Sequence, residues 1–358
     1  MNQGEPRISV TVVVCIESGI LEPLTLRMVG SLRAFGGRFA SADVVAVTPR
    51  LSPPLSGETR RQMAALGIRH LVIRPRNPYA WHHYTNKVEA LAAVEQQVAT
   101  NVVAWLDSDI IFTREPRCLD LPSSVDFAAS APDTGVIGSV GGSDPNDRFW
   151  GRAAALIGKT VDELPWLDTG DGHRIRFYWN SGVFAYRRRT GFGTQYRSDM
   201  RAFLDGRVAR THSQVHYADQ VVLGLTVLRL GLSWRQLDAS ENFPLCSWLP
   251  GNYDPAKVAD VGVLHFHDSM SGGLWGRFLG TIAPVHPSVY HWLSPMGPVT
   301  VPRARLARAV RELLRASRGL RRKLYYSRSD FGKHTRIESG SAAASDDGAS
   351  VASRGAEP

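Results

Sequence analysis

The sequence predicts an α/β fold built on a mostly parallel central sheet, and two observations support this class. Apolar, β-branched runs alternate with segments of helical periodicity from the N-terminus as far as Ile110. This alternation is typical of right-handed βαβ units, whose helices cover both faces of the sheet. Several of the runs, such as ISVTVVVCI, are nearly continuous, as expected of strands buried on both faces. Ligands of such sheets bind beyond the carboxyl ends of the strands.

The elements that precede Ile110 follow in a regular order. Short runs rich in Val, Ile and Leu predict strands, at residues 8–16, 43–48, 68–75 and 101–106. Apolar residues that recur every three or four positions predict helices between them, at residues 24–35, 58–67 and 83–99. The last strand runs directly into the sequence Asp107-Ser108-Asp109.

The rest of the chain is more mixed. Further strands are predicted at 125–130, 174–188, 233–238 and 260–268, and a helix at 217–231. Residues 133–147 are expected to form a loop, and 133–172 is the candidate acceptor region, because such sites are built from variable loops. We expect one domain over 1–300, a basic amphipathic helix over 301–337 and a disordered tail over 338–358.

Composition limits the class of protein. The chain has 358 residues and three scattered cysteines without a CxxC pair, so a reducing, cytoplasmic compartment is expected. No apolar run approaches the roughly 18 residues of a membrane span. The formal charge is +9, and residues 303–328 hold ten Lys and Arg against one acid, Glu312. The remaining chain is balanced, so no nucleic-acid partner is expected.

The pair Asp107 and Asp109 is the first candidate for chemistry. Two carboxylates at the end of a buried strand repel each other, and burying either is costly unless a positive group is present. A divalent cation relieves that repulsion, and hard oxygen ligands suit Mg²⁺ or Mn²⁺. The alternative is an acidic surface turn, since loops collect aspartates for their turn chemistry.

Other residues offer partners for this pair, each with a structural alternative. His265 and His267 share one face of a late strand and could be ligands, which would favour Mn²⁺. Lys87 could contact a diphosphate or simply be a solvated helix lysine. Asn180-Ser181-Gly182 interrupts a strand, as a bulge or a close backbone approach would. Asp219-Gln220 opens a helix, where the helix dipole alone favours an acid.

The order of these motifs resembles the nucleotide-sugar glycosyltransferases of the GT-A fold. The motifs are NKVEAL, WLDSDIIF, YWNSGVFAYRR, ADQVVLGL and VLHFHDS, and the resemblance spans about residues 8 to 280. It is greatest to the retaining family that contains glycogenin and the bacterial lipopolysaccharide galactosyltransferases. The resemblance implies a Rossmann-like sheet flanked by helices, a UDP-sugar donor and a divalent ion.

The resemblance also implies roles for individual residues. Asp107, Ser108 and Asp109 would bind the donor, and the two aspartates with His265 would hold the metal. Lys87 would contact the diphosphate or sugar, and Asn180 and Gly182 would line the sugar pocket. Asp219 and Gln220 would lie beneath the anomeric carbon. The catalytic candidates are therefore Asp219, Gln220 and Asn180.

The chain departs from the family pattern after the histidine. The family has a Gly-x-x-Lys-Pro-Trp segment that clamps the diphosphate, whereas SMSGGLWGRF stands here without a lysine. Arg277 or Lys87 could take its place. The stereochemistry of transfer, the sugar, the acceptor and the choice between His265 and His267 stay open at this point.

The function predicted from the sequence is a metal-dependent, retaining glycosyltransferase acting from a nucleoside diphosphate sugar. A nucleotidyltransferase is the first alternative, but it would show a basic, glycine-rich loop after the first strand, where CIESGILEP stands. A catalytically inactive nucleotide-sugar-binding protein is the second. Metal-dependent donor binding without turnover would identify that case.

The basic helix suggests a further partner. Residues 303–328 place leucines at helical spacing with arginines between them, as in helices that lie on anionic membranes. A peripheral enzyme at the inner face of the membrane, acting on a lipid-linked or cell-envelope glycan, would use such a helix. A helix packed on the catalytic domain and a nonspecific nucleic-acid contact are the alternatives.

Overall fold

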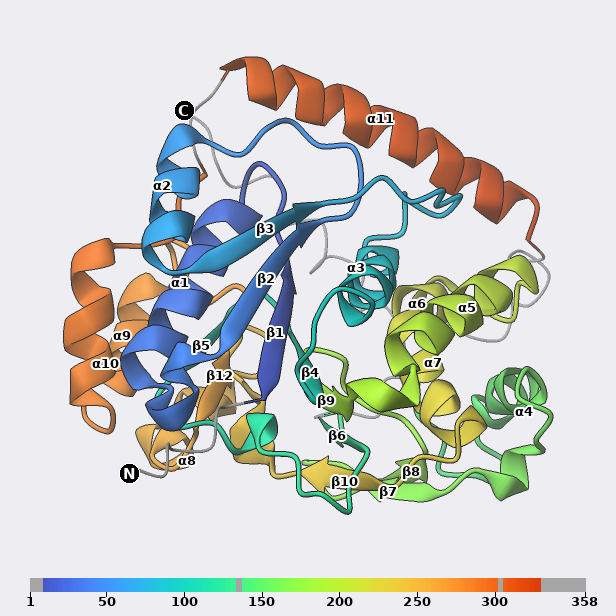
Figure 1. Cartoon of the computed structure of the whole chain (residues 1–358). Helices are drawn as coiled ribbons and strands as arrows, with labels where there is room; N and C mark the ends of the chain where they lie inside the picture. The colour runs from blue at the N-terminus through green and yellow to red at the C-terminus, as the bar shows by residue number, and fades with distance from the viewer. Residues whose placement is uncertain (1–8, 133–136, 302–304, 330–358) are drawn as a thin grey trace, which may run out of the picture.

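The structure is a computed structural model that describes residues 9–132, 137–301 and 305–329. A seven-stranded sheet forms its centre (Figure 1). The strand order is β10 (Trp234–Leu237), β6 (Phe127–Ser130), β9 (Val183–Arg187), β4 (Val102–Leu106), β1 (Val10–Cys15), β2 (Asp43–Thr48), β3 (Ile68–Val72). Neighbouring strands of this sheet are parallel except where β9 pairs with β4 and β6. The predicted α/β class with a mostly parallel sheet is confirmed.

Helices cover both faces of this sheet because its strands are apolar on both sides. One face carries α1 (Leu21–Phe35) and α2 (Gly57–Ala65), and the other carries α3 (Thr85–Glu95), α5 (Phe192–Asp205) and α7 (Ala218–Arg229). Successive side chains of β1 divide between them, as the strand period of two requires. Val12 and Val14 pack with α1, whereas Val13 packs with α3.

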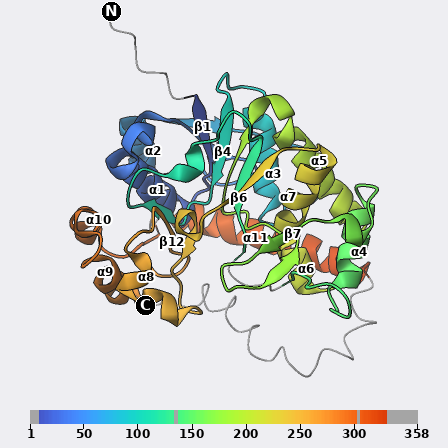
Figure 2. The same cartoon turned by 90° about the horizontal axis from the view of Figure 1, so that it is seen from below.

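A second, three-stranded sheet fixes the turn that follows β4. It consists of β11 (Phe243–Pro244), β12 (Val263–His265) and β5 (Ile110–Phe112), with β12 in the middle. The pairing of β12 with β5 is antiparallel and sets His265 opposite Ile110. Asp109 and His265 therefore become neighbours through register alone. Helices α8 (Pro255–Val258), α9 (Trp275–Ile282) and α10 (Pro287–Leu293) gather beside this sheet (Figure 2).

The elements predicted before Ile110 are all present, with ends that differ by a few positions. The predicted strand at 174–188 is instead two strands, β8 (Arg174–Arg176) and β9, separated by the Asn180-Ser181-Gly182 segment. β8 pairs with β7 (Trp166–Asp168) in a separate hairpin. The segment 133–136 and the tail 338–358 lie outside the described residues.

Several helices were not predicted, among them α4 (Asp147–Ala155), α5, α6 (His212–His216), α9 and α10. The pattern of α5 was readable, since Phe192, Tyr196, Met200 and Phe203 are buried along one side at helical spacing. The candidate acceptor region is also more ordered than expected, because its described part contains α4 and β7.

The predicted basic helix is α11 (Arg305–Ser327), and it lies across the carboxyl ends of the central strands (Figure 1). Its last turn is fixed by Tyr325, which is 9% exposed and donates a hydrogen bond to the carbonyl of Leu204 at 3.1 Å. The Tyr325 ring also lies 4.9 Å from the ring of Trp81, centroid to centroid. The helix therefore packs on the body that the preceding elements form.

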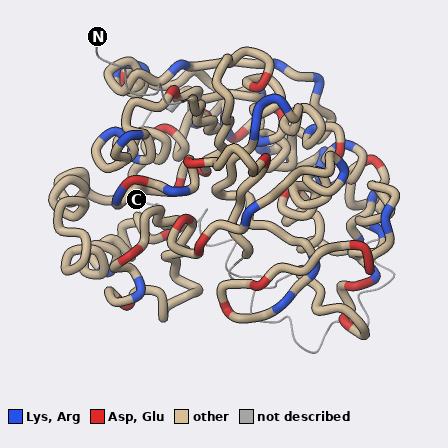
Figure 3. The backbone as a smooth tube through the Cα atoms, turned by 60° about the horizontal axis from the view of Figure 1, so that its bottom comes forward, with Lys and Arg blue, Asp and Glu red and all other residues tan. Residues whose placement is uncertain are grey.

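Charge on the rest of the molecule is mixed. Lys and Arg positions alternate with Asp and Glu positions along the chain (Figure 3), in line with the balanced composition outside 303–328. Among the described residues, every helix is either too short or too polar to cross a membrane.

Candidate active site

A cavity of about 2140 Å³ opens at the carboxyl ends of the central strands. Its walls come from the segments that follow β1, β2 and β4, from the start of α3, from β12 and from α11. Eight of the nine predicted site residues line it: Lys87, Asp107, Ser108, Asp109, Asn180, Gly182, Gln220 and His265. The ninth, Asp219, is 1% exposed and lies behind this wall.

A carboxylate and two imidazoles meet at one end of the cavity. The Oδ1 atom of Asp109 lies 3.2 Å from Nε2 of His265, and its Oδ2 atom lies 3.7 Å from Nδ1 of His267. The two imidazole rings are stacked with centroids 3.8 Å apart. One potential ligand atom from each residue lies within 4.8 Å of the others. Both histidines thus face Asp109, so both are candidate ligands.

The protonation of this cluster follows from burial and from its own charges. Burial opposes ionisation of Asp109, but the adjacent His265 and His267 outweigh it and lower the pKa of that carboxyl. Burial, together with the neighbouring His265, lowers the pKa of His267 to about 3. His267 is therefore a neutral imidazole at physiological pH, the form that coordinates metals.

Gly182 makes room for His265. A Cβ atom at position 182 would lie 2.6 Å from Cε1 of the His265 ring, closer than real side chains approach. The other ring nitrogen of His265, Nδ1, lies 3.0 Å from Oδ1 of Asn242 and is oriented by it. The glycine inside the strand pattern therefore marks a close approach, and the ring that approaches is the metal-ligand candidate.

Lys87 is buried and joins the two aspartate motifs. Its Nζ atom donates hydrogen bonds to Oγ of Ser181 at 2.8 Å and to Oδ2 of Asp219 at 3.2 Å. The same atom lies 3.4 Å from Oδ1 of Asp107. Burial raises the pKa of Asp107, and Lys87 acts against that rise. The interpretation of Lys87 as a solvated helix lysine is wrong, because its side chain is 3% exposed.

The remaining candidates, Asn180, Ser108 and Asp107, differ in their hydrogen-bond partners. Asn180 accepts a hydrogen bond from the Gly182 amide at 2.8 Å, which holds its side chain over the turn. Ser108 donates to the Cys15 carbonyl at 3.1 Å and ties the turn to β1. Asp107 is not part of the three-residue cluster around Asp109. Its Oδ1 accepts a hydrogen bond from Trp105 Nε1 at 2.7 Å.

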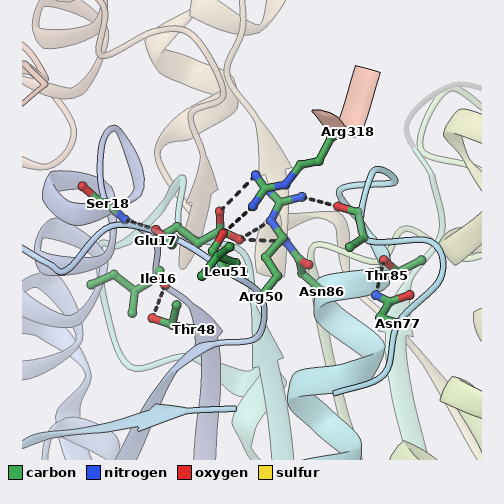
Figure 4. Close-up of polar contacts among 12 residues, drawn as sticks. Ile16, Glu17, Ser18, Thr48, Arg50, Leu51, Asn77, Thr85, Asn86 and Arg318 are labelled. Atoms are coloured by element: carbon green, nitrogen blue, oxygen red, sulfur yellow. Dashed lines mark hydrogen bonds and ion pairs between the residues drawn. The ribbon is translucent and has the colours of Figure 1, made fainter. Parts of the chain in front are cut away.

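Sequence reasoning missed a second polar group in the cavity (Figure 4). The Glu17 carboxylate follows β1 and accepts from Arg50 Nε at 2.7 Å and from Asn86 at 2.9 Å. Arg318 of α11 reaches the same carboxylate from above, at 4.0 Å (Figure 4). No short sequence motif indicates this group, because its four members come from four distant parts of the chain.

Two other expectations about the cavity need correction. Arg277, the candidate substitute for the missing clamp lysine, is not among the described residues that line the cavity, and its guanidinium lies over the Tyr253 ring at 4.1 Å. Described residues of the candidate acceptor region, 137–172, do not line it either. Trp248, which is 61% exposed beside His267, lines it instead.

The donor set fits a divalent ion. One carboxylate and two imidazoles converge, and their ligand atoms are close enough to share one ion. A mixed oxygen and imidazole set suits Mn²⁺ better than Mg²⁺, which prefers oxygen ligands alone. His265 is also oriented by Asn242, as metal-binding histidines usually are by a second residue.

Comparison with known proteins gives one match in sequence and several in structure. Residues 12–231 match the family described as the Rhodobacterales glycosyltransferase domain. No curated protein shows significant similarity to the sequence. Mouse xyloside xylosyltransferase 1 is 12% identical over 72% of this chain and 97% of that chain, with a TM-score of 0.41. The galactosyltransferase LgtC, solved with donor and acceptor sugar analogs, is 16% identical over 82% of this chain and 98% of that chain, with a TM-score of 0.49.

Proposed function

Because this chain belongs to the Rhodobacterales glycosyltransferase domain family, we propose that it moves a sugar from a nucleoside diphosphate sugar in a metal-dependent reaction. A UDP-sugar is the proposed donor. The observation that carries the proposal is the convergence of Asp109, His265 and His267 at one end of a large cavity, at the carboxyl edge of a parallel sheet. The match to a glycosyltransferase family disfavours the nucleotidyltransferase alternative.

In this proposal Asp109, His265 and His267 hold Mn²⁺ or Mg²⁺, and Asp107 is a further ligand. The bound ion would neutralise the donor diphosphate and stabilise it as a leaving group. Lys87 stands beside Asp107 and adds a fixed positive charge at the same place. A positive charge held in a buried site stabilises the transition state most where negative charge develops.

The sugar end of the donor would lie against Asn180, Gly182 and Gln220, which line the cavity. Asp219 acts as a positioning residue, since Lys87 and Ser181 both donate to its Oδ2 atom. We propose a retaining hexosyltransferase, with Gln220 as the side chain nearest the anomeric carbon. The resemblance to the glycogenin family supports retention.

The acceptor is proposed to be a lipid-linked or cell-envelope glycan. The support comes from α11, whose exposed apolar side chains form a stripe beside basic residues: Leu306, Val310, Leu313, Leu320 and Leu324. A helix with this surface lies well on an anionic membrane. We therefore propose that the protein is peripheral on the inner face of the membrane, with the cavity close to the lipid surface.

Release of UDP from a panel of UDP-sugars tests the reaction. The wild-type protein should release UDP from one of them with Mn²⁺ and not with EDTA, and Asp109→Ala should abolish the release. The NMR spectrum of the fresh sugar product reports its anomeric configuration, and inversion would refute the retaining assignment. Metal-dependent UDP binding without turnover on any donor or acceptor would favour the inactive binding protein.

Sedimentation with vesicles tests the membrane surface. The variant Leu313→Ser/Leu320→Ser should lose binding to vesicles of anionic lipid, because both side chains are more than 60% exposed on the stripe. The control Val140→Ser removes a comparably exposed apolar side chain, 58%, from outside the helix and the cavity wall and should bind as the wild type does. Equal binding by the stripe variant and the wild type would rule out this surface.

A further inference from the structure

The long C-terminal helix turns its basic side inward. Five arginines recur along α11 at intervals of three and four residues, which places them on one face of a helix. All five line the cavity: Arg308, Arg311, Arg315, Arg318 and Arg322. The apolar stripe lies on the opposite side of the helix and is exposed. An amphipathic helix on a globular domain normally does the reverse and buries its apolar face.

Two of these arginines hold the helix in place. Arg311 donates to Oγ of Ser18 at 3.1 Å and packs on Gly19, whose Cα would carry a Cβ only 3.4 Å from the Arg311 side chain. Arg318 lies over Glu17 and donates to the Leu51 carbonyl (Figure 4). Burial, together with the neighbouring Arg50, lowers the pKa of Arg318.

The side chains of the other three arginines do not fix the helix to the body. Arg315 pairs with Glu312 of its own helix, at 3.2 Å between Nη1 and Oε2. The side chains of Arg308 and Arg322 make no hydrogen bond or ion pair with another described residue. Three guanidinium groups therefore stand on the cavity wall with at most one local carboxylate between them.

The cavity as a whole is positive on this side. Seven Lys and Arg residues line it, five of them from α11, against four Asp and Glu residues. Two of these acids, Asp107 and Asp109, already pair with Lys87 and the two histidines. A wall of this kind attracts a ligand with negative charge, and planar guanidinium groups match phosphate oxygens best.

We propose that the arginine face of α11 binds a phosphate group of a substrate. The proposal rests on the proposed function, because it adds a second group of anion-binding side chains to the same cavity. The cavity volume of about 2140 Å³ exceeds the roughly 300–1,000 Å³ of a single-ligand pocket, so it has room for donor and acceptor together. A phosphate-bearing acceptor and the donor diphosphate are the two carriers of the group that fit this chemistry.

Titration of inorganic pyrophosphate in the presence of EDTA tests the site, because EDTA removes divalent ions and so prevents metal-dependent binding. The test variant is Arg308→Gln/Arg315→Gln/Arg322→Gln, which spares the two arginines that fix the helix. The control is Arg321→Gln/Lys323→Gln/Arg328→Gln, which removes the same charge from the end of the same helix and the residue after it, outside the cavity wall. The wild type and the control should bind pyrophosphate alike, and the test variant at least about tenfold more weakly.

Absence of pyrophosphate binding by the wild type, or an equal loss in the two variants, would overturn the proposal. Titration of UDP in the presence of Mn²⁺ then distinguishes the donor diphosphate from a phosphate on the acceptor. A loss of UDP affinity in the test variant alone would assign the wall to the donor diphosphate, and unchanged UDP affinity would assign it to a phosphate on the acceptor. Failure of the proposed function would look different, since the wild type would then not bind UDP with Mn²⁺ at all.

Discussion

Asp109 follows β4 in a turn whose neighbours make its carboxylate a candidate metal ligand. Its two carboxylate oxygens each face a different imidazole, and the two rings stack on one another. His267 adopts a left-handed backbone conformation, with φ of 46°, that brings it back beside His265. A non-glycine residue in that region is uncommon, and residues of this kind cluster at functional sites. The cluster thus combines buried charge with a strained residue.

The contact between Gly182 and His265 gives the first prediction. Gly182→Ala should weaken Mn²⁺ binding at least about tenfold, because the new methyl group displaces a ligand ring. Isothermal titration of Mn²⁺ measures the effect. Gly151→Ala is the control, since nothing lies within 4 Å of a Cβ there and alanine favours the helix. Equal Mn²⁺ affinity in both variants would exclude His265 as a ligand.

The buried charges around Lys87 give a second prediction. Lys87→Met leaves the 1%-exposed Asp219 without its cation, which should lower the free energy of unfolding by about 3–5 kcal/mol. Adding Asp219→Asn should recover part of that loss. Lys159→Met, at a surface pair with Glu163, should cost under about 1 kcal/mol. Urea unfolding measures all three, and losses that simply add in the double variant would contradict the coupling.

At the residue scale the sequence predicts part of this site. Asp107, Asp109 and His265 could be selected because they follow buried strands at the edge where ligands bind. The sequence offers His267 as a candidate on the same strand face as His265, whereas the structure places it after β12 in a left-handed backbone conformation. The pairing of Lys87 with Asp219 joins residues 132 positions apart, and only the tertiary fold brings the first turn of α3 to the first turn of α7.

At the scale of the element, α11 is the part of the molecule that departs most from expectation. The sequence predicts its existence, its charge and its apolar stripe. Its orientation could not be predicted, because helical spacing gives two faces and does not say which one meets the body. Glu17, Arg50 and the ring of Trp81 decide the orientation, and they lie far earlier in the chain.

The role of Glu17 in this orientation can be tested. Glu17→Gln leaves Arg50 and Arg318 without their shared carboxylate, so α11 should loosen. Hydrogen exchange of amides in residues 305–327 should become at least about tenfold faster, while exchange in the central strands stays unchanged. Glu58→Gln is the control at an exposed ion pair with Arg61. Unaltered exchange in α11 would show that Glu17 does not hold the helix.

At the scale of the whole molecule, the periodicity of the chain before Ile110 suffices for the α/β class. The βαβ alternation, the parallel order and the edge that carries the site all follow from local pattern and general handedness. The antiparallel strand β9 and the small second sheet do not, since both depend on pairing between distant segments. These two features are what place Gly182 and His265 beside Asp109.

The central claim is that this cavity binds a nucleoside diphosphate through an ion held at Asp109. Isothermal titration of UDP tests it most directly, with Mn²⁺ and then with EDTA, on the wild type and on Asp109→Ala. The control Asp120→Ala removes an aspartate paired with Arg38 on the surface. We predict that UDP binds the wild type and the control only with Mn²⁺, and that Asp109→Ala binds at least about tenfold more weakly. UDP binding that persists in EDTA, or that is as strong in Asp109→Ala as in the wild type, would contradict the account.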